Sequence, residues 1–276
     1  SISMGGRVVT EAGSLRLAGV ANNVQPLQSR FGDSSEGGPQ AVAVDDQGDV
    51  FIADSANHVI RRVNASGVVT VAGELGVPGF ADGKDGAVRF NYPTGIVCLS
   101  RPEGTVLYVA DSGNHVIRKV SVQGSSGTFV STVAGKAGQA GYVNGPGSQA
   151  RFFQPSDITY ASDGVSESLF VADYLNRAVR RIVISASDVP VTTLAGCARS
   201  DVASGLQYSR VLPNGVPLEP IPGYRDGAEA QFRYPRGIAA DRNFIYVADE
   251  QNQAIRKISL AGDTSTLAGA SRLRGY

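Results

Sequence analysis

The chain has 276 residues, and its 25 basic and 25 acidic side chains cancel, so no overall field attracts nucleic acid or an anionic membrane. Hydrophobic residues make up 42% and charged residues 18%, which excludes a disordered or coiled-coil chain. No apolar run approaches the roughly 18 residues of a membrane-spanning helix, so no membrane segment is expected.

The first residues of the chain do not resemble a signal peptide. Residues 1–6 are expected to be an expression scar or a linker. Residues 7–19 end in Leu17-Ala18-Gly19. The offset from Val9 to Gly19 equals that from Val63 to Gly73, and residues 63–73 end in Val71-Ala72-Gly73. Because the second of these segments belongs to a longer repeat, residues 7–19 are predicted to be half of another copy.

A segment in which an apolar run ends in Ala-Asp, with Asn three residues later and Arg four residues after that, occurs four times. The copies are Phe51 to Val63, Tyr108 to Val120, Phe170 to Ile182 and Tyr246 to Ile258. Each follows a proline that opens a short apolar strand, and each precedes a strand that ends in Ala-Gly. The prolines are Pro39, Pro93, Pro155 and Pro235, and the glycines are Gly73, Gly135, Gly196 and Gly269.

Each repeat therefore predicts four short antiparallel strands, a to d, rich in Val, Ile, Tyr, Phe and Thr, with Gly, Asn and Asp at the turns. This is the plan of a β-propeller blade, and it accounts for the 34 glycines. We predict an all-β propeller over residues 7–269, with four complete blades and a partial N-terminal blade. The tail, residues 270–276, is too short for two more strands, so the ring would have five or six blades if completed. Open blade edges would favour association with another copy.

The repeats resemble the NHL repeat family. The motif is carried by Pro93-Thr94-Gly95-Ile96, by Tyr108-Val109-Ala110-Asp111 and by Asn114-His115-Val116-Ile117-Arg118-Lys119. The resemblance implies a propeller of about six blades that serves as a platform for protein or RNA. It also implies a distant relation to a few propeller enzymes, and a plausible place in surface adhesion proteins.

Three polar positions recur in every repeat. They are the aspartates Asp54, Asp111, Asp173 and Asp249, the asparagines Asn57, Asn114, Asn176 and Asn252, and the arginines Arg61, Arg118, Arg180 and Arg256. The residue that follows the recurring arginine is Arg in two repeats and Lys in the other two, whereas the recurring position itself is always arginine. A position that takes only arginine indicates a planar, two-pronged contact with a carboxylate. We interpret the three as a structural link within or between blades; the alternative is an arginine ring that binds phosphate.

Metal and cofactor sites are not expected. The two histidines, His58 and His115, occupy equivalent repeat positions, and no third histidine or cysteine cluster completes a zinc site. Cys98 and Cys197 form no CxxC pair, and no nucleophile motif is present. The chain is therefore predicted not to be an enzyme.

The connectors between strand d and the next strand a carry a second repeat, G-[FY]-x-[DN]-G, followed by a phenylalanine three residues before the proline. These phenylalanines, Phe90, Phe152 and Phe232, are predicted to plug the space between blades. The connector from Gly196 to Pro235 spans 39 positions, against 20 from Gly73 to Pro93, because of an insertion at residues 197–222. Long loops commonly carry function. The predicted partner-binding residues are Phe80, Tyr142, Tyr208, Arg210, Leu212, Pro213, Leu218, Tyr224 and Arg225.

The hypothesis that follows is a non-catalytic interaction module that binds a protein, or alternatively a glycan, through the face that carries these connectors. One alternative is an RNA-binding NHL domain, which would need a basic face with stacking aromatics; the zero net charge counts against it. Another is a propeller enzyme with an axial metal. Asn64-Ala65-Ser66 is a formal glycosylation site, which favours an extracellular or cell-surface place in a longer protein.

Overall fold

The computed structural model describes residue 31 and residues 38–124, 127–196 and 223–269. Within these ranges the regular structure consists of β-strands and short 3-10 turns, without an α-helix. The chain divides into unit 1, residues 1–113 and 118–131, and unit 2, residues 114–117 and 132–276. Each unit is described by itself.

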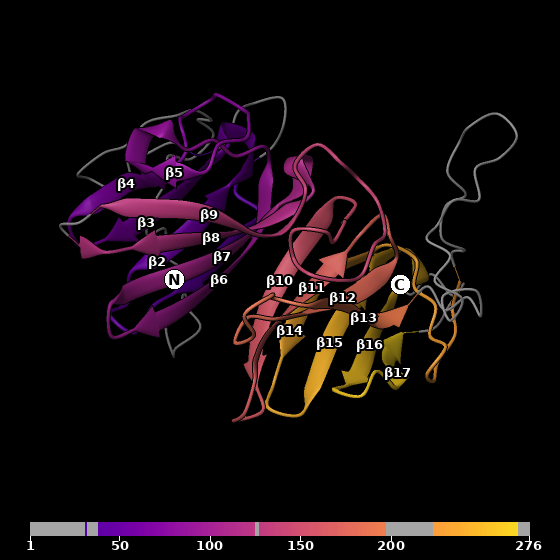
Figure 1. Cartoon of the computed structure of the whole chain (residues 1–276). Coiled ribbons are helices and arrows are strands. Elements are labelled where there is room, and N and C mark those ends of the chain that lie inside the picture. Colours follow the sequence, from indigo (N-terminus) through magenta and orange to yellow (C-terminus); the bar gives the residue numbers. More distant parts are fainter. Residues whose placement is uncertain (1–30, 32–37, 125–126, 197–222, 270–276) are drawn as a thin grey trace, which may run out of the picture. The chain divides into compact units, whose positions relative to one another are not determined.

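The first two sheets are antiparallel meanders (Figure 1). Blade 1 has the order β1 (Ala41–Val44), β2 (Val50–Asp54), β3 (Val59–Asn64) and β4 (Gly67–Ala72). Blade 2 consists of β6 (Pro93–Arg101), β7 (Gly104–Asp111), β8 (Val116–Val122) and β9 (Thr128–Gly135). A short strand from the preceding connector, β5 (Gly83–Lys84), pairs with the outer edge of β9.

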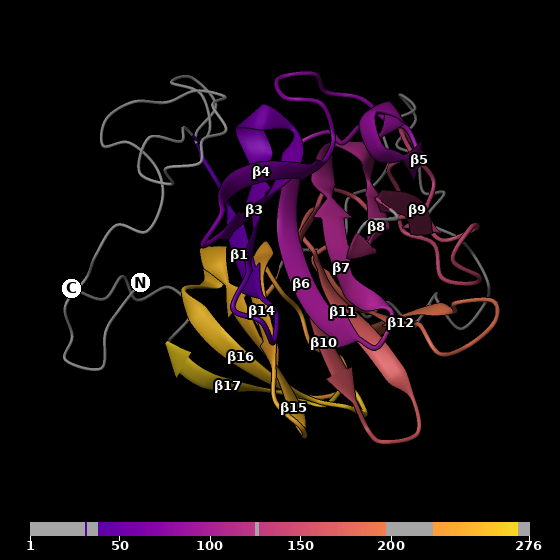
Figure 2. The same cartoon turned by 90° about the vertical axis from the view of Figure 1, so that its left-hand side faces the viewer.

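Unit 2 contains two further meanders, whose strands lie side by side in both views (Figures 1 and 2). Blade 3 consists of β10 (Pro155–Ser162), β11 (Glu167–Asp173), β12 (Ala178–Val183) and β13 (Val191–Gly196). Blade 4 consists of β14 (Pro235–Ala240), β15 (Phe244–Asp249), β16 (Ala254–Ser259) and β17 (Thr264–Gly269). Their connectors reach the outer strand through the bridges Gly145–Val191 and Gly227–Thr264, as β5 does in blade 2.

The turn between the second and third strand of a blade is tight because its last residue adopts a positive φ. In blade 1 the 3-10 turn η2 (Ser55–Asn57) is closed by His58 at φ 58°, and in blade 4 η7 (Glu250–Asn252) is closed by Gln253 at φ 53°. A left-handed residue reverses the chain over a few residues. As a result, the aspartate that ends the second strand and the arginine on the third strand come close together.

Apolar side chains fill the space between neighbouring blades. In unit 1 Phe90 packs with Phe51 and Leu107, and all three are at most 1% exposed. In unit 2 Phe232 packs with Phe170 and Ile245 in the same way. The phenylalanines three residues before Pro93, Pro155 and Pro235 are all fully buried. Burial of their apolar surface is a main stabilising term.

The prediction of an all-β fold made of four-stranded antiparallel propeller blades is confirmed. The partial N-terminal blade, the insertion 197–222 and the tail 270–276 lie outside the described residues. The described residues contain no helix with the length and apolar character that a membrane crossing requires.

Candidate functional site

The recurring arginine of blade 2, Arg118, connects its own blade to the connector that precedes it. Its Nη1 donates to Asp111 Oδ2 at 2.8 Å, and its Nη2 donates to the Ala81 carbonyl at 2.7 Å. Its Nε donates to the Asp82 carboxylate at 3.0 Å. Arg118 has no exposed surface. One guanidinium therefore joins the blade and the connector by charge-assisted hydrogen bonds.

The same arrangement recurs in blades 3 and 4. Arg180 donates to Asp173 at 2.8 Å and to Asn144 Oδ1 of its connector at 2.8 Å. Arg256 donates to Asp249 at 2.9 Å and to Asp226 of its connector at 2.7 Å. In blade 1 the bond from Arg61 to Asp54 is 3.2 Å long. All four arginines are fully buried, so no guanidinium surface is left for a bound phosphate.

The guanidinium groups of blades 2 to 4 each lie between two aromatic rings, and that of blade 1 lies against one described ring. Phe80 and Phe90 have their ring centres 4.7 and 4.9 Å from the Arg118 Cζ. The corresponding pairs are Tyr142 and Phe152 around Arg180, at 4.8 and 5.1 Å, and Tyr224 and Phe232 around Arg256, at 4.9 and 5.0 Å. Phe31 lies 4.6 Å from Arg61. These are cation–π contacts, and they stabilise the charge of a buried arginine.

The recurring asparagine supports the same network. Asn176 Nδ2 donates to Asp173 at 2.8 Å and to the Gly141 carbonyl at 2.7 Å, and Asn252 repeats both bonds with Asp249 and Gly223. In blade 1 Asn57 donates to Asp54 at 2.9 Å. The equivalent asparagine of blade 2, Asn114, is also buried, with 7% of its surface exposed. Burial raises the pKa of the Asp173 and Asp249 carboxyls, while their arginine and asparagine partners oppose that shift. The aspartate, asparagine and arginine thus form a buried structural unit.

The connector aromatics differ in their exposure. Phe80 is 44% exposed and Tyr224 is 37% exposed, so each keeps a solvent-facing surface. Tyr142 is only 9% exposed, because it packs on Arg180 and its hydroxyl contacts Thr193 Oγ1. Tyr142 therefore packs mainly within the fold, and its role in binding a partner stays a prediction. Arg225 is exposed and pairs with Glu229.

The remaining residues predicted to bind a partner, Tyr208, Arg210, Leu212, Pro213 and Leu218, lie outside the described residues. Asn64 is the last residue of β3, just before the turn to β4, and its Nδ2 donates to Asp49 at 3.2 Å.

The histidines act as hydrogen-bond acceptors. His58 Nδ1 accepts the backbone N–H of Tyr92 at 3.0 Å, and His115 Nδ1 accepts that of Gln154 at 3.2 Å. No group of three or more His, Cys, Asp and Glu side chains able to hold a metal occurs in the part of the chain that is described. Burial, together with Asp45 and Asp46, raises the pKa of the Cys98 thiol to about 11, which disfavours the reactive thiolate.

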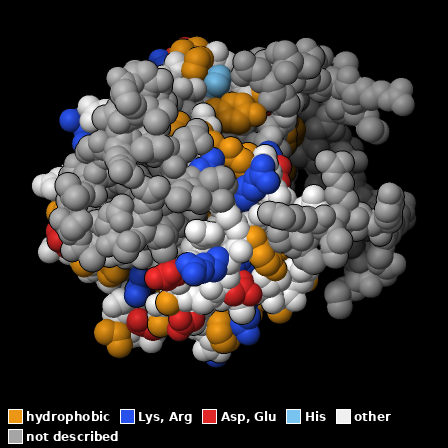
Figure 3. Space-filling view, turned by 90° about the vertical axis from the view of Figure 1, so that its right-hand side faces the viewer, with side chains coloured by type: hydrophobic (Ala, Val, Ile, Leu, Met, Phe, Trp, Pro, Cys, Tyr) orange, Lys and Arg blue, Asp and Glu red, His pale blue; other side chains and the backbone are white. Residues whose placement is uncertain are grey.

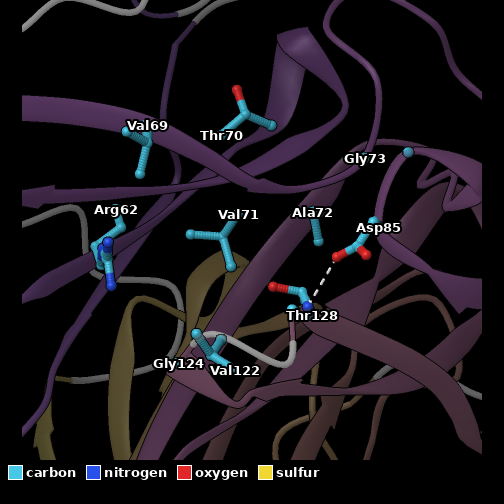
Figure 4. Close-up of a pocket in the computed structure, with 12 residues that line it drawn as sticks. Arg62, Val69, Thr70, Val71, Ala72, Gly73, Asp85, Val122, Gly124 and Thr128 are labelled. Carbon is cyan, nitrogen blue, oxygen red and sulfur yellow. Dashed lines mark hydrogen bonds between the residues drawn. The ribbon is translucent and has the colours of Figure 1, made fainter.

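A cavity of about 430 Å³ lies beside β4 in unit 1. Figure 4 shows Arg62 and Asp85 well apart in its lining, with Val71 between them. The Asp85 carboxylate accepts the backbone N–H of Thr128 at 2.9 Å, and Arg62 contacts Asp49 at 3.5 Å. Among its described lining residues Asp85 is the one carboxylate, so the cavity does not offer a paired acid and base.

Two features of the network go beyond the sequence interpretation. The connector motif alone does not predict a partner for its [DN] residue, yet Asp82, Asn144 and Asp226 accept hydrogen bonds from the arginines. In blade 3 the third residue of the P-x-G-I motif is Asp157 instead of glycine, and its Oδ2 accepts the Ile238 N–H of blade 4 at 2.9 Å. Asp157 could have been found from the sequence, because alignment of the four repeats shows an aspartate at a position where the motif has glycine.

The face in Figure 3 shows basic and acidic side chains mixed among apolar ones. A mixed surface differs from the continuous basic face that RNA recognition uses. This observation concerns only the side chains drawn in colour on that face.

Comparison with known proteins identifies the repeat. The NHL repeat family matches residues 37–62. NHL repeat-containing protein 2 of Bos taurus is 31% identical over 261 residues, covering 87% of this chain and 33% of that protein. The chain thus spans about a third of the length of the NHL repeat-containing proteins that it matches.

Solved structures agree on the fold. A protein of unknown function from Bacteroides thetaiotaomicron superposes with a TM-score of 0.58 at 22% identity, over 83% of this chain and 48% of that one. An auxiliary nutrient binding protein from the same organism gives a TM-score of 0.54 at 19% identity, over 80% and 46%. With four copies of the motif in four blades, the sequence matches show that this chain belongs to the NHL repeat family of β-propeller proteins.

Proposed function

We propose that the chain is a non-catalytic interaction module that binds a protein partner through the connectors between its blades. The observation that carries the proposal is the pair of solvent-exposed rings, Phe80 and Tyr224, at the same position of two connectors. Each ring rests on a buried arginine, so it is held in place before a partner arrives. An ordered aromatic residue loses little entropy on binding and is a common anchor of protein interfaces.

The recurring polar residues support a scaffold role. The aspartates and arginines that would be the first candidates for acid–base chemistry are buried and bonded to one another. The insertion 197–222 belongs to the same class of connector, and we assign it to the same binding face. A surface or adhesion protein is the setting that we propose for the module, with a glycan partner as its alternative.

The test compares capture of partner proteins by purified wild-type chain and by matched variants. We expect Phe80→Ser and Tyr224→Ser to reduce capture, and Arg225→Glu to reduce it as well, because all three change exposed connector surface. Val165→Ser is the control, since Val165 is 91% exposed on the turn between β10 and β11. Equal capture by the connector variants and by the control would contradict the proposal.

The surface setting has its own test. Expression through a secretory pathway should add a glycan to Asn64, seen as a mass shift that an amidase removes and that Ser66→Ala abolishes. Secretion of the folded chain without that shift would count against glycosylation at this turn.

A further inference from the structure

The connector of blade 3 contains an asparagine followed by glycine, Asn144-Gly145. In such a pair the backbone nitrogen of the glycine can attack the Cγ of the asparagine side chain. A new C–N bond closes a succinimide ring, and the side-chain nitrogen leaves as ammonia. Water then opens the ring to aspartate or to isoaspartate. Glycine favours the attack because it has no Cβ to hinder the approach of its nitrogen.

Two other blades carry aspartate where blade 3 carries Asn144. In blade 2 Arg118 Nε donates to Asp82 Oδ1 at 3.0 Å, and in blade 4 Arg256 Nη2 donates to Asp226 Oδ1 at 2.7 Å. Both aspartates are followed by glycine, as Asn144 is. The connector position therefore accommodates a carboxylate beside a buried arginine.

Blade 4 shows how a carboxylate is held at this position. Asp226 Oδ1 also accepts the Thr266 hydroxyl at 3.0 Å, and Asp226 Oδ2 accepts the Thr266 backbone N–H at 3.0 Å. Burial opposes the charge of Asp226, but the bonds from Thr266 and Arg256 outweigh it and lower the pKa of the carboxyl. The folded connector of blade 4 thus favours the ionised form.

The surroundings of Asn144 match those of Asp226 except at one atom. Asn144 Oδ1 accepts Arg180 Nη2 at 2.8 Å and the Thr193 hydroxyl at 3.3 Å, so its Nδ2 takes the place of Asp226 Oδ2. An amide nitrogen donates hydrogen bonds and cannot accept the Thr193 N–H, whereas a carboxylate oxygen can. Figure 1 shows β12 and β13, the strands of Arg180 and Thr193, next to one another.

The fold holds the reacting atoms of the Asn-Gly pair apart. The Gly145 N–H donates to the Val191 carbonyl of β13 at 3.0 Å, and the Val191 N–H donates back at 2.8 Å. The Asn144 side chain is fixed by its bond to Arg180. Asn144 is exposed, so water reaches the site, and the pairing of Gly145 with β13 is what opposes ring closure.

We propose that Asn144 is a deamidation site that reacts when its connector is not paired with β13, and that blade 3 accommodates the aspartate product but not isoaspartate. Aspartate gains the charge and the acceptor that Asp226 has in blade 4. Isoaspartate adds a methylene group to the backbone, which moves Gly145 out of register with Val191. The site uses none of the residues named for partner binding, so it holds or fails separately from the proposed function.

The site and its protection are tested by following the reaction in the whole chain at mildly alkaline pH, folded and in guanidinium chloride. Peptide mapping by mass spectrometry measures conversion at Asn144. We expect the folded chain to react more than about tenfold more slowly, because the attack requires local opening. In denaturant Gly145→Ala should slow the reaction, since the added methyl hinders the attacking nitrogen. Equal rates in the folded and unfolded chain, or no slowing in Gly145→Ala, would overturn the proposal.

The aspartate product is tested directly with Asn144→Asp. At neutral pH we expect a rise in Tm of about 2 °C, because a charged acceptor strengthens the contacts with Arg180 and Thr193. The reciprocal variant of blade 4, Asp226→Asn, should lower the Tm by a similar amount. A carboxyl whose pKa is lowered by folding stabilises above its unfolded pKa, so the rise should disappear as the pH falls below about 3. An unchanged or lower Tm of Asn144→Asp at neutral pH would contradict the assignment.

The two products are compared within one sample. The chain is partly deamidated in denaturant and refolded, and the refolded fraction is separated from aggregates by size-exclusion chromatography. We expect aspartate at position 144 in the refolded fraction and enrichment of isoaspartate in the aggregates, measured by peptide mapping. An equal distribution of both products would show that blade 3 does not discriminate between them, and would overturn that part of the proposal.

Discussion

Arg180 Nη1 lies 2.8 Å from Asp173 Oδ2, and neither side chain has any exposed surface. The same guanidinium also bonds the Val143 carbonyl and the Asn144 side chain of the connector ahead of the blade. Both terminal nitrogens of Arg180 are hydrogen-bonded, whereas its buried Nε has no hydrogen-bond partner. Removal of one partner from such a buried ion pair leaves an uncompensated charge and is strongly destabilising. The connector and the blade are thereby held as one unit.

Arg180→Lys should lower the free energy of unfolding by about 3 kcal/mol, because an ammonium cannot reach Asp173, Val143 and Asn144 at once. Chemical denaturation measures the loss. The control is Arg181→Lys at the next, partly exposed position, where the repeat already accepts Lys119 and Lys257. Equal losses in the two variants would contradict a special role for the buried arginine.

Tyr142→Ala should cost about 3 kcal/mol of stability, whereas Phe80→Ala should cost about 1 kcal/mol, although both rings stack on an arginine. The difference follows from their exposed fractions of 9% and 44%. Thermal unfolding of both variants checks the order. A larger loss for Phe80→Ala would mean that the connector of blade 2 is held mainly by its exposed ring.

Asp157 should make the stability of unit 2 depend on pH. Burial raises the pKa of its carboxyl to about 6 in the folded chain, while hydrogen bonds from the Ile238 and Ile158 N–H groups oppose the shift. The unfolded chain titrates near the ordinary value of 3.8. A raised carboxyl pKa means that the folded chain binds more protons, so stability from this group is present below pH 4 and is lost as the pH rises to 6.

The expected loss between pH 4 and pH 6 is on the order of 2 kcal/mol, and Asp157→Asn should remove it. Unfolding at a series of pH values measures this slope. Asp163→Asn is the control, because backbone N–H groups of Ser166 and Val165 lower the pKa of the Asp163 carboxyl and give it the opposite slope. An unchanged slope in Asp157→Asn would contradict the prediction.

Gly196→Ala should destabilise the chain by about 3 kcal/mol or more, because the new methyl group would meet the Phe232 ring and the Arg177 carbonyl at a φ of +92°. Gly227→Ala is matched in backbone, with φ +91°, but no atom lies within 4 Å of its added Cβ. For Gly227→Ala we therefore expect a loss of only about 1–2 kcal/mol in the free energy of unfolding, which is the cost of placing a non-glycine residue in the left-handed region. Calorimetry of the two variants separates the packing effect from the conformational effect.

Much of the fold could be predicted from the sequence because it is periodic. The spacing of the recurring aspartate, asparagine and arginine, and the Ala-Gly strand ends, determine four strands per repeat and the turn that brings Asp111 next to Arg118. These are local relations within one repeat. Strand alternation and turn chemistry are sufficient to specify them.

Contacts between segments could only come from the tertiary structure. The repeat pattern does not predict that Arg118 donates to Asp82 of the preceding connector. It also does not predict that Tyr142 is buried while Phe80 is exposed. Ile60 and Ile255 are the same residue at the same repeat position, yet one is 0% and the other 40% exposed. The physical reason is that burial depends on the neighbour that covers a side chain, and that neighbour is set by the arrangement of the blades.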